Sequence, residues 1–143
     1  MEEFPGFRIA PNDAVATEKY AKMNGMKIYV SHSKDFDFLN ELYKPIRAST
    51  LNNQHEFFLP HENDRAINTQ EVIKKSNLIL AEVSFPATGQ GIELGWANLL
   101  HIPILCVSKE GNKISGSLKY ITKDFITYTD AADLIAKLRE RLS

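Results

Sequence analysis

The sequence has a single cysteine, no long apolar segment and no excess of either charge. One cysteine excludes an intramolecular disulfide, and the apolar run around Cys106 favours a small buried side chain over a reactive thiol. No apolar run approaches the roughly 20 residues that a membrane-spanning helix needs. Residues 1–25 carry acids and lack the apolar core of a signal peptide, so we expect a cytoplasmic protein. With 17 basic and 18 acidic side chains, no broad positive field indicates nucleic acid as a partner.

The sequence also lacks the usual signatures of a metal or cofactor site. The four histidines, at positions 32, 55, 61 and 101, do not have the spacing of zinc ligands. Asp35 and Asp37 are close together, but acids at the start of a helix are the commoner explanation. We therefore expect no metal and no cofactor.

What is present is the pattern of a small α/β protein. The length of 143 residues fits one domain, which we place at 26–143 after an irregular extension at 1–25. Apolar stretches predict strands at 27–30, 56–59, 78–83, 102–107 and 125–128. Helical spacing alternates with them at 35–48, where Pro45 should kink or end the helix, at 63–75 and 92–100, and after the N-cap Asp130. This order predicts a three-layer, Rossmann- or flavodoxin-like parallel sheet of about five strands, with helices on both faces.

In such folds ligands bind outside the carboxyl ends of the strands. That rule points to the segments 31–37, 84–91 and 108–117, each of which follows a predicted strand. The middle one belongs to the stretch AEVSFPATGQGIELGWA, residues 81–97, which joins the most apolar strand to a helix.

Three residues of this stretch indicate a binding site. Gly89 and Gly91 can adopt a positive φ and let the backbone approach a ligand, and a helix that follows offers free N–H groups to an anion. Glu93 falls in the first turn of the predicted helix, where the helix dipole keeps a carboxylate ionised, as a nucleophile requires. Two plainer interpretations stay open: glycines that serve packing alone, and an acid that only stabilises the start of a helix.

The run GIELGWA, preceded by AEVSFPATGQ, resembles the nucleoside 2-deoxyribosyltransferase family, and within it the deoxynucleoside 5′-monophosphate N-glycosidases. This resemblance implies that Glu93 attacks the anomeric carbon of a deoxyribose. The covalent intermediate then passes to water in the hydrolases or to another base in the transferases. It also implies that Tyr29, in KIYVS, hydrogen-bonds the glutamate, although a half-buried strand aromatic is the plainer interpretation of Tyr29.

The resemblance further implies where a nucleotide's phosphate binds. Family members use backbone and serine groups after the first strand, which here is Ser31-His32-Ser33, with His32 where glycine is usual. They use a serine or other small residue six positions before the glutamate, which here is Ala87, with Thr88 beside it.

A third element of the phosphate site comes from a neighbouring subunit in the family. Ser115, in KISGSLK, matches the serine that reaches that phosphate, and Ser117 is a near alternative. The resemblance therefore implies a homodimer, although serines at turns are common for local reasons.

The sequence departs from the family at a second carboxylate, an Asp on the helix before the central strand that helps the base to leave. Counting back from IKKSNLIL places Thr69 at that position, and threonine is no general acid at neutral pH. Two alternatives to an N-glycosidase or deoxyribosyltransferase therefore stay open. One is a non-catalytic nucleotide-binding module, and the other is a TIR-like domain that cleaves NAD or mediates interactions, suggested by IYVSHSKDFDF.

Overall fold

Five parallel strands form one sheet in the computed structural model, which describes residues 25–63 and 66–143. The sheet order is β2-β1-β3-β4-β5, with every neighbouring pair parallel. The strands are β1 (Lys27–His32), β2 (Glu56–Phe58), β3 (Leu78–Glu82), β4 (Ile104–Lys109) and β5 (Phe125–Tyr128). This confirms the predicted parallel α/β fold. Apart from Gly25, the predicted extension 1–25 lies outside the described residues.

The central strands are mostly apolar because both faces of the sheet are covered. In β3, Leu78 and Leu80 belong to one core cluster, whereas Ile79 and Ala81 belong to the other. Successive side chains of a strand point to opposite faces, so a central strand needs apolar residues at every position. All five residues of β3 are buried.

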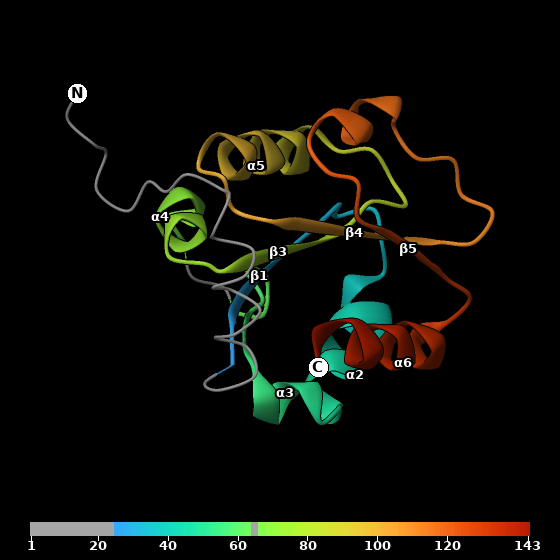
Figure 1. Ribbon diagram of the computed structural model, residues 1–143. Coiled ribbons are helices and arrows are strands. Elements are labelled where there is room, and N and C mark those ends of the chain that lie inside the picture. Colours follow the sequence, from blue (N-terminus) through green and yellow to red (C-terminus); the bar gives the residue numbers. More distant parts are fainter. Residues whose placement is uncertain (1–24, 64–65) are drawn as a thin grey trace.

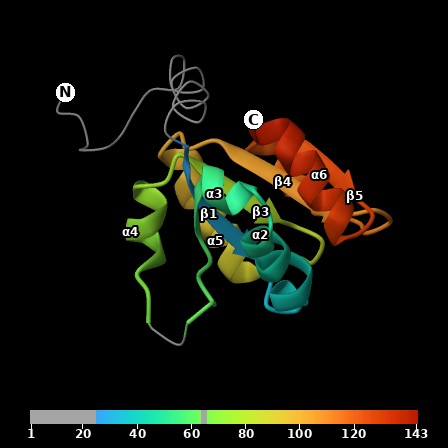
Figure 2. The same ribbon diagram turned by 90° about the horizontal axis from the view of Figure 1, so that it is seen from below.

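The helices divide between these two faces, as Figures 1 and 2 show. The first face carries the π-helical turn η2 (Leu39–Tyr43), α2 (Lys44–Ala48), α3 (Leu51–Gln54) and α6 (Ala131–Leu142). The second face carries α4 (Thr69–Lys74), α5 (Thr88–Leu99) and the 3-10 helix η3 (Gly116–Tyr120). The result is a three-layer arrangement.

Two helices differ from the prediction for local reasons. The helix expected at 35–48 begins at Leu39 with a π turn, in which the Lys44 N–H bonds the Leu39 carbonyl. Pro45 follows directly and lacks an N–H, so the wider turn accommodates it without ending the helix. The helix expected at 63–75 begins only at Thr69, because the side chain of Asn68 caps it by accepting from the Glu71 N–H at 3.3 Å.

Other local predictions are confirmed. Asp130 is the N-cap of α6, and its carboxylate accepts from the Asp133 N–H at 2.8 Å. Cys106 is a buried free thiol, and burial raises its pKa to about 12. It therefore stays protonated and packs as a small apolar side chain.

The strand order creates a crevice at the carboxyl edge of the sheet. The chain leaves β1 toward η2 and α2 on the first face, and it leaves β3 toward α5 on the second face. Because β1 and β3 are neighbours, their connections part at this point. Open α/β sheets place their ligand sites at such a position.

Candidate functional site

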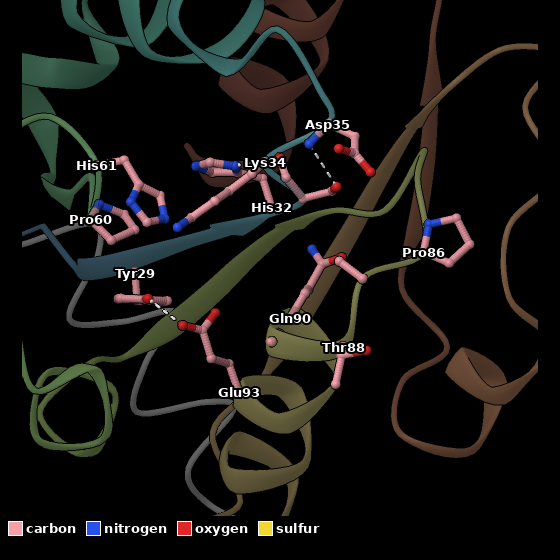
Figure 3. A pocket seen from close by; sticks show the side chains of 13 residues that line it. Tyr29, His32, Lys34, Asp35, Pro60, His61, Pro86, Thr88, Gln90 and Glu93 are labelled. Carbon is pink, nitrogen blue, oxygen red and sulfur yellow. Dashed lines mark hydrogen bonds between the residues drawn. The ribbon is translucent and has the colours of Figure 1, made fainter.

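A cavity of about 550 Å³ opens at the carboxyl ends of β1 and β3, at the point where the two connections part. Figure 3 shows the side chains that line it, which come from β1 and the loop after it, the end of β2 and the start of α5. They are Tyr29, His32, Ser33, Lys34, Asp35, Pro60, His61, Pro86, Ala87, Thr88, Gly89, Gln90 and Glu93.

The carboxylate of Glu93 is held by two hydroxyls of β1. Tyr29 Oη donates to Glu93 Oε2, and Ser31 Oγ donates to Oε1, each at 2.8 Å. Tyr29 and Ser31 are two apart on one strand, so both side chains point to the face that α5 covers. Figure 3 shows Tyr29 and Glu93 facing each other at one end of the cavity. The arrangement fixes the orientation of the carboxylate.

Burial raises the pKa of Glu93 above its ordinary value of 4.5, while the bonds from Tyr29 and Ser31 lower it. Burial and the nearby carboxylate likewise raise the pKa of Tyr29, which therefore stays a neutral donor. The two hydroxyls thus partly offset the cost of a buried charge, as hydrogen bonds to an ionised form do.

The start of α5 differs from the prediction in a way that matters for Glu93. The helix begins at Thr88, so the expected glycine turn is wrong: Gly89 and Gly91 lie inside the helix, and neither has a positive φ. Glu93 consequently lies in the second turn, beyond the reach of the helix dipole. Burial of Gln90 and Leu94 against the sheet outweighs the low helix propensity of glycine, about 1 kcal/mol per residue.

Gln90 joins the two strands on either side of the crevice. Its Nε2 donates to the Ser31 carbonyl at 3.1 Å and to the Glu82 carbonyl at 2.9 Å, at the ends of β1 and β3. The side chain is buried and lies one turn before Glu93 on the same helix. Gln90 is not among the site residues predicted from the sequence, although its spacing of three from Glu93 places both on one helix face.

His32 lines the cavity with both ring nitrogens already paired. The Ser33 carbonyl can only accept, so His32 Nδ1 carries the proton and donates to it at 2.9 Å. Nε2 then accepts from Tyr43 Oη at 2.7 Å, and Tyr43 Oη accepts from the His61 N–H at 3.0 Å. Burial lowers the pKa of His32 to about 4. At neutral pH it is an uncharged part of the wall that offers a ligand its ring rather than a free N–H.

Two basic side chains that are not among the predicted site residues line the same side as His32. Lys34 and His61 are both exposed, and the charge of Lys34 contributes to lowering the pKa of His61, after burial. Figure 3 shows the two side chains close together, across the cavity from Glu93. His61 follows β2, and the carboxyl-edge rule would have selected it had it been applied to that strand.

The remaining predicted residues divide between two places. Ala87, Thr88 and Gly89 line the cavity at the start of α5, together with Ser33, whose Oγ accepts from the Asp35 N–H at 3.0 Å. Thr69 does not line the cavity, but it is the first residue of α4 and is close enough to the Tyr29 hydroxyl to lower its pKa.

Ser115, Ser117 and Gly91 line a second cavity of about 330 Å³ instead. It lies between α5 and η3 and shares Pro86, Ala87 and Gln90 with the first. Ser115 Oγ accepts from the Ser117 N–H at 3.3 Å, so one function of this serine is to cap η3.

A second buried carboxylate, Glu82, lines neither cavity. It accepts from the Ser84 N–H at 2.8 Å, from Ser84 Oγ at 2.7 Å and from Tyr128 Oη. Burial raises its pKa, and these bonds lower it. Glu82 therefore belongs to the framework that holds the ends of β3 and β5 together.

Within residues 25–63 and 66–143, no three His, Cys, Asp or Glu side chains gather as a metal site would require. None of the helices in these ranges has the length and apolar character needed to span a bilayer.

Comparison with known proteins gives structural neighbours only. No protein-family model and no curated protein matches the sequence. The fold is similar to that of a CMP N-glycosidase from Clostridium botulinum, BcmB, with a TM-score of 0.59 and 17% identity over 80% of this chain and 98% of the other. It is also similar to a conserved protein from Enterococcus faecalis V583, with a TM-score of 0.56 and 18% identity over 80% of this chain and 98% of the other. The chain therefore has the Rossmann-like α/β fold of these proteins.

Proposed function

We propose that this protein cleaves the N-glycosidic bond of a nucleoside or nucleotide, with Glu93 as the nucleophile. The observation that carries the proposal is a half-buried carboxylate, oriented by two hydroxyls, at the ligand edge of a parallel sheet. A structural neighbour of the same fold is named as a CMP N-glycosidase, which supports this class of reaction.

In the proposed reaction an oxygen of Glu93 bonds to the anomeric carbon as the bond from that carbon to the base nitrogen breaks. The electron pair of the broken bond leaves with the base, which takes up a proton. Water then attacks the same carbon and releases the sugar and the carboxylate. Transfer to a second base in place of water gives the deoxyribosyltransferase reaction.

The start of α5 supports a phosphate on the ligand. Its N-cap, Ala87, provides no side-chain hydrogen bond, so backbone N–H groups of the first turn stay available beside the cavity. Such groups bind phosphate well. Lys34 adds a positive charge to the lining of the same cavity.

A non-catalytic nucleotide-binding module is the second candidate, favoured by Thr69. This threonine starts α4 close to Tyr29, where a second carboxylate would stand in the family that the sequence resembles. Within the described part of the chain, Asp35 is the only other acid that lines the cavity, and Figure 3 shows it at the end away from Tyr29. Among the described residues, the departing base would therefore have no nearby carboxylic acid as a proton donor.

We also propose a homodimer that pairs the outer face of α5. Ile92 is 51% exposed and Leu99 is 71% exposed on this helix, with the half-buried Trp96 between them. A pair of such faces would cover apolar surface and bring η3, with Ser115, beside a second copy. Leu99→Glu should convert a dimer to a monomer in light scattering at micromolar concentration, whereas Leu39→Glu on the opposite face should not. A wild-type monomer contradicts the proposal.

The test of function is a screen for base release. Ribo- and deoxyribonucleoside monophosphates, free nucleosides and NAD are incubated with the full chain, and free base is measured by chromatography. We expect release from at least one nucleotide and its loss in Glu93→Gln. Glu71→Gln is the matched control, because Glu71 is an exposed acid on α4 whose carboxylate pairs with Lys74 at 3.6 Å.

The outcomes separate the candidates. Binding of nucleotides by calorimetry without base release favours the binding module. Release of nicotinamide from NAD alone favours the TIR-like alternative. If the wild type neither binds a nucleotide nor releases a base, the proposed function is contradicted.

A further inference from the structure

The imidazole ring of His61 lines the cavity and is available to a ligand. In the described part of the chain, no group forms a hydrogen bond with either of its ring nitrogens. His61 differs in this respect from His32, whose ring nitrogens are paired with Ser33 and Tyr43. An exposed histidine at a cavity, with its ring nitrogens unpaired, can exchange a proton with what binds there.

Three contacts hold the segment that carries this ring. The His61 N–H donates to Tyr43 Oη at 3.0 Å. Glu62, the next residue, accepts from Arg47 Nε at 2.9 Å and from Arg47 Nη2 at 2.8 Å. The ring itself packs against that of Phe38, with centroids 5.7 Å apart. The fold therefore positions His61 although the side chain is exposed.

The groups of the site follow one another along the carboxyl edge of the sheet in the order of the parts of a nucleotide. The start of α5, which is the proposed phosphate site, follows β3. Tyr29, on the neighbouring strand β1, holds Glu93. Tyr29 is in register with Phe58, the last residue of β2, and His61 lies three residues further on. A nucleotide with its phosphate at α5 and its anomeric carbon at Glu93 would extend its base toward His61.

The inference rests on the proposed function, in which the departing base takes up a proton. A nucleophile attacks the anomeric carbon from the face opposite the leaving base, so a proton donor for the base belongs across the cavity from Glu93. Figure 3 shows His61 on that side. We propose that His61 donates this proton to the departing base.

The protons balance over the two steps of the reaction. In the first step the bond from the anomeric carbon to the base breaks, its electron pair goes to the base, and a proton moves from the His61 imidazolium to the base. In the second step water approaches from the face that the base has left. Its oxygen bonds to the anomeric carbon, its proton returns to the neutral imidazole, and the carboxylate of Glu93 is released.

The surroundings of His61 give the expected pH dependence. Burial, and after it the charge of Lys34, lowers the pKa of His61 below its ordinary value of 6.5. The donor is the protonated ring, so kcat/KM should fall as pH rises through a value below 6.5. The acidic limb, set by Glu93, lies above 4.5. The other titratable or charged groups around His61 are His32, Tyr43, and Glu62 with its partner Arg47.

The test compares His61→Asn with the wild type on two kinds of leaving group. For a nucleotide whose base must gain a proton, kcat/KM should fall roughly 10²–10⁴-fold, and the alkaline limb of its pH profile should disappear because asparagine does not titrate. Nicotinamide mononucleotide has a cationic base that leaves as a neutral molecule without a proton, so its cleavage should change little. The matched control is His101→Asn, at an exposed histidine after α5 whose φ of 60° asparagine tolerates.

The outcomes distinguish this inference from the proposed function. Glu93→Gln should lose cleavage of both kinds of substrate, whereas His61→Asn should lose only one. An equal fall for both in His61→Asn overturns the inference and leaves the role of Glu93 intact. If the wild type does not cleave nicotinamide mononucleotide, the pH profile decides, and an alkaline limb that persists in His61→Asn overturns the inference. Failure of the wild type to release a base from any nucleotide overturns both.

Discussion

Replacing Glu93 by glutamine should strongly lower base release and leave the fold intact, and the hydrogen bonds of the site give the size of the effect on stability. Glutamine is nearly isosteric with glutamate. Its Oε1 can accept from one of the two hydroxyls, those of Tyr29 and Ser31, and its Nε2 can donate to the oxygen of the other. Both contacts are therefore kept, although as neutral hydrogen bonds, which are worth about 1 kcal/mol less each than bonds to a charged group.

The loss of charge offsets this weakening. Burial raises the pKa of Glu93 despite its two hydrogen bonds, so the cost of desolvating the ionised group exceeds what the bonds return. A neutral amide avoids that cost at neutral pH. We therefore expect the free energy of unfolding to change by no more than about 1 kcal/mol, which is a shift of roughly 3–4 °C in Tm for a chain of this length.

The chemical step should respond far more strongly. An amide is a poor nucleophile toward an anomeric carbon, so base release should fall by about 10³-fold or more at saturating nucleotide. Chromatography measures the rate, circular dichroism measures Tm, and calorimetry measures nucleotide binding, which should remain. Undiminished base release in Glu93→Gln would refute the role of Glu93. A fall in Tm of roughly 10 °C or more would refute the energetic argument, because the loss of activity would then report unfolding.

Three further substitutions test other parts of the structure. Ser31→Ala removes a bond to the ionised carboxylate of Glu93, so the pKa of Glu93 should rise further above 4.5 and the acidic limb of the kcat/KM profile should move to higher pH; an unmoved limb contradicts this. Tyr128→Phe removes a donor to buried Glu82 and should lower the free energy of unfolding by about 1–3 kcal/mol in urea titrations. Because burial raises the pKa of Glu82, the folded protein holds the proton of this carboxyl more firmly than the unfolded chain does, so the free energy of unfolding falls as pH rises above 4.5. The loss of stability in Tyr128→Phe should therefore be larger at pH 8 than at pH 5. Equal losses at the two pH values contradict the assignment. Thr69→Asp should raise base release by about 10-fold or more if a missing general acid limits the reaction, whereas Gln70→Asp, one residue further along α4, should not; equal rates for the two variants contradict that explanation.

The sheet could be predicted because its strands follow a simple physical pattern. The continuous apolar run at 78–83 and the later run at 102–107 mark strands buried on both faces, and the structure has β3 and β4 there. The strand at 125–128 and the N-cap Asp130 agree with the structure as predicted. Where the local sequence pattern and the burial of a segment favour the same element, local rules suffice to predict that element.

The start of α5 shows where local rules fail. Glycine has the lowest helix propensity after proline, so Gly89 and Gly91 indicate a turn when only neighbouring residues are considered. The helix nevertheless includes both, since Gln90 bonds to two strand ends that are 59 and 8 residues away in the sequence. No pattern confined to the segment 84–91 contains that information.

His32 illustrates the same limit for a binding site. Its position after the first strand marked it as a ligand-binding residue, and it does line the cavity. Its ring nitrogens are occupied by Tyr43, 11 residues away, and by the Ser33 carbonyl. Hydrogen-bond partners decide whether a polar side chain is available, and the sequence does not give partners that the fold brings together.

The polar groups of the cavity wall indicate how a ligand would be oriented in it. The Glu93 carboxylate on α5 is an acceptor that faces the cavity and matches a sugar hydroxyl. Lys34 and the first turn of α5 match an anion instead. A phosphorylated pentose satisfies both sides at once, whereas a free base has no anionic group for the second side. In the proposed reaction, no second carboxylic acid among the described residues lies beside Tyr29, where α4 begins with Thr69, so the departing base has no carboxylic proton donor on that side and bases that leave readily without one are the expected substrates.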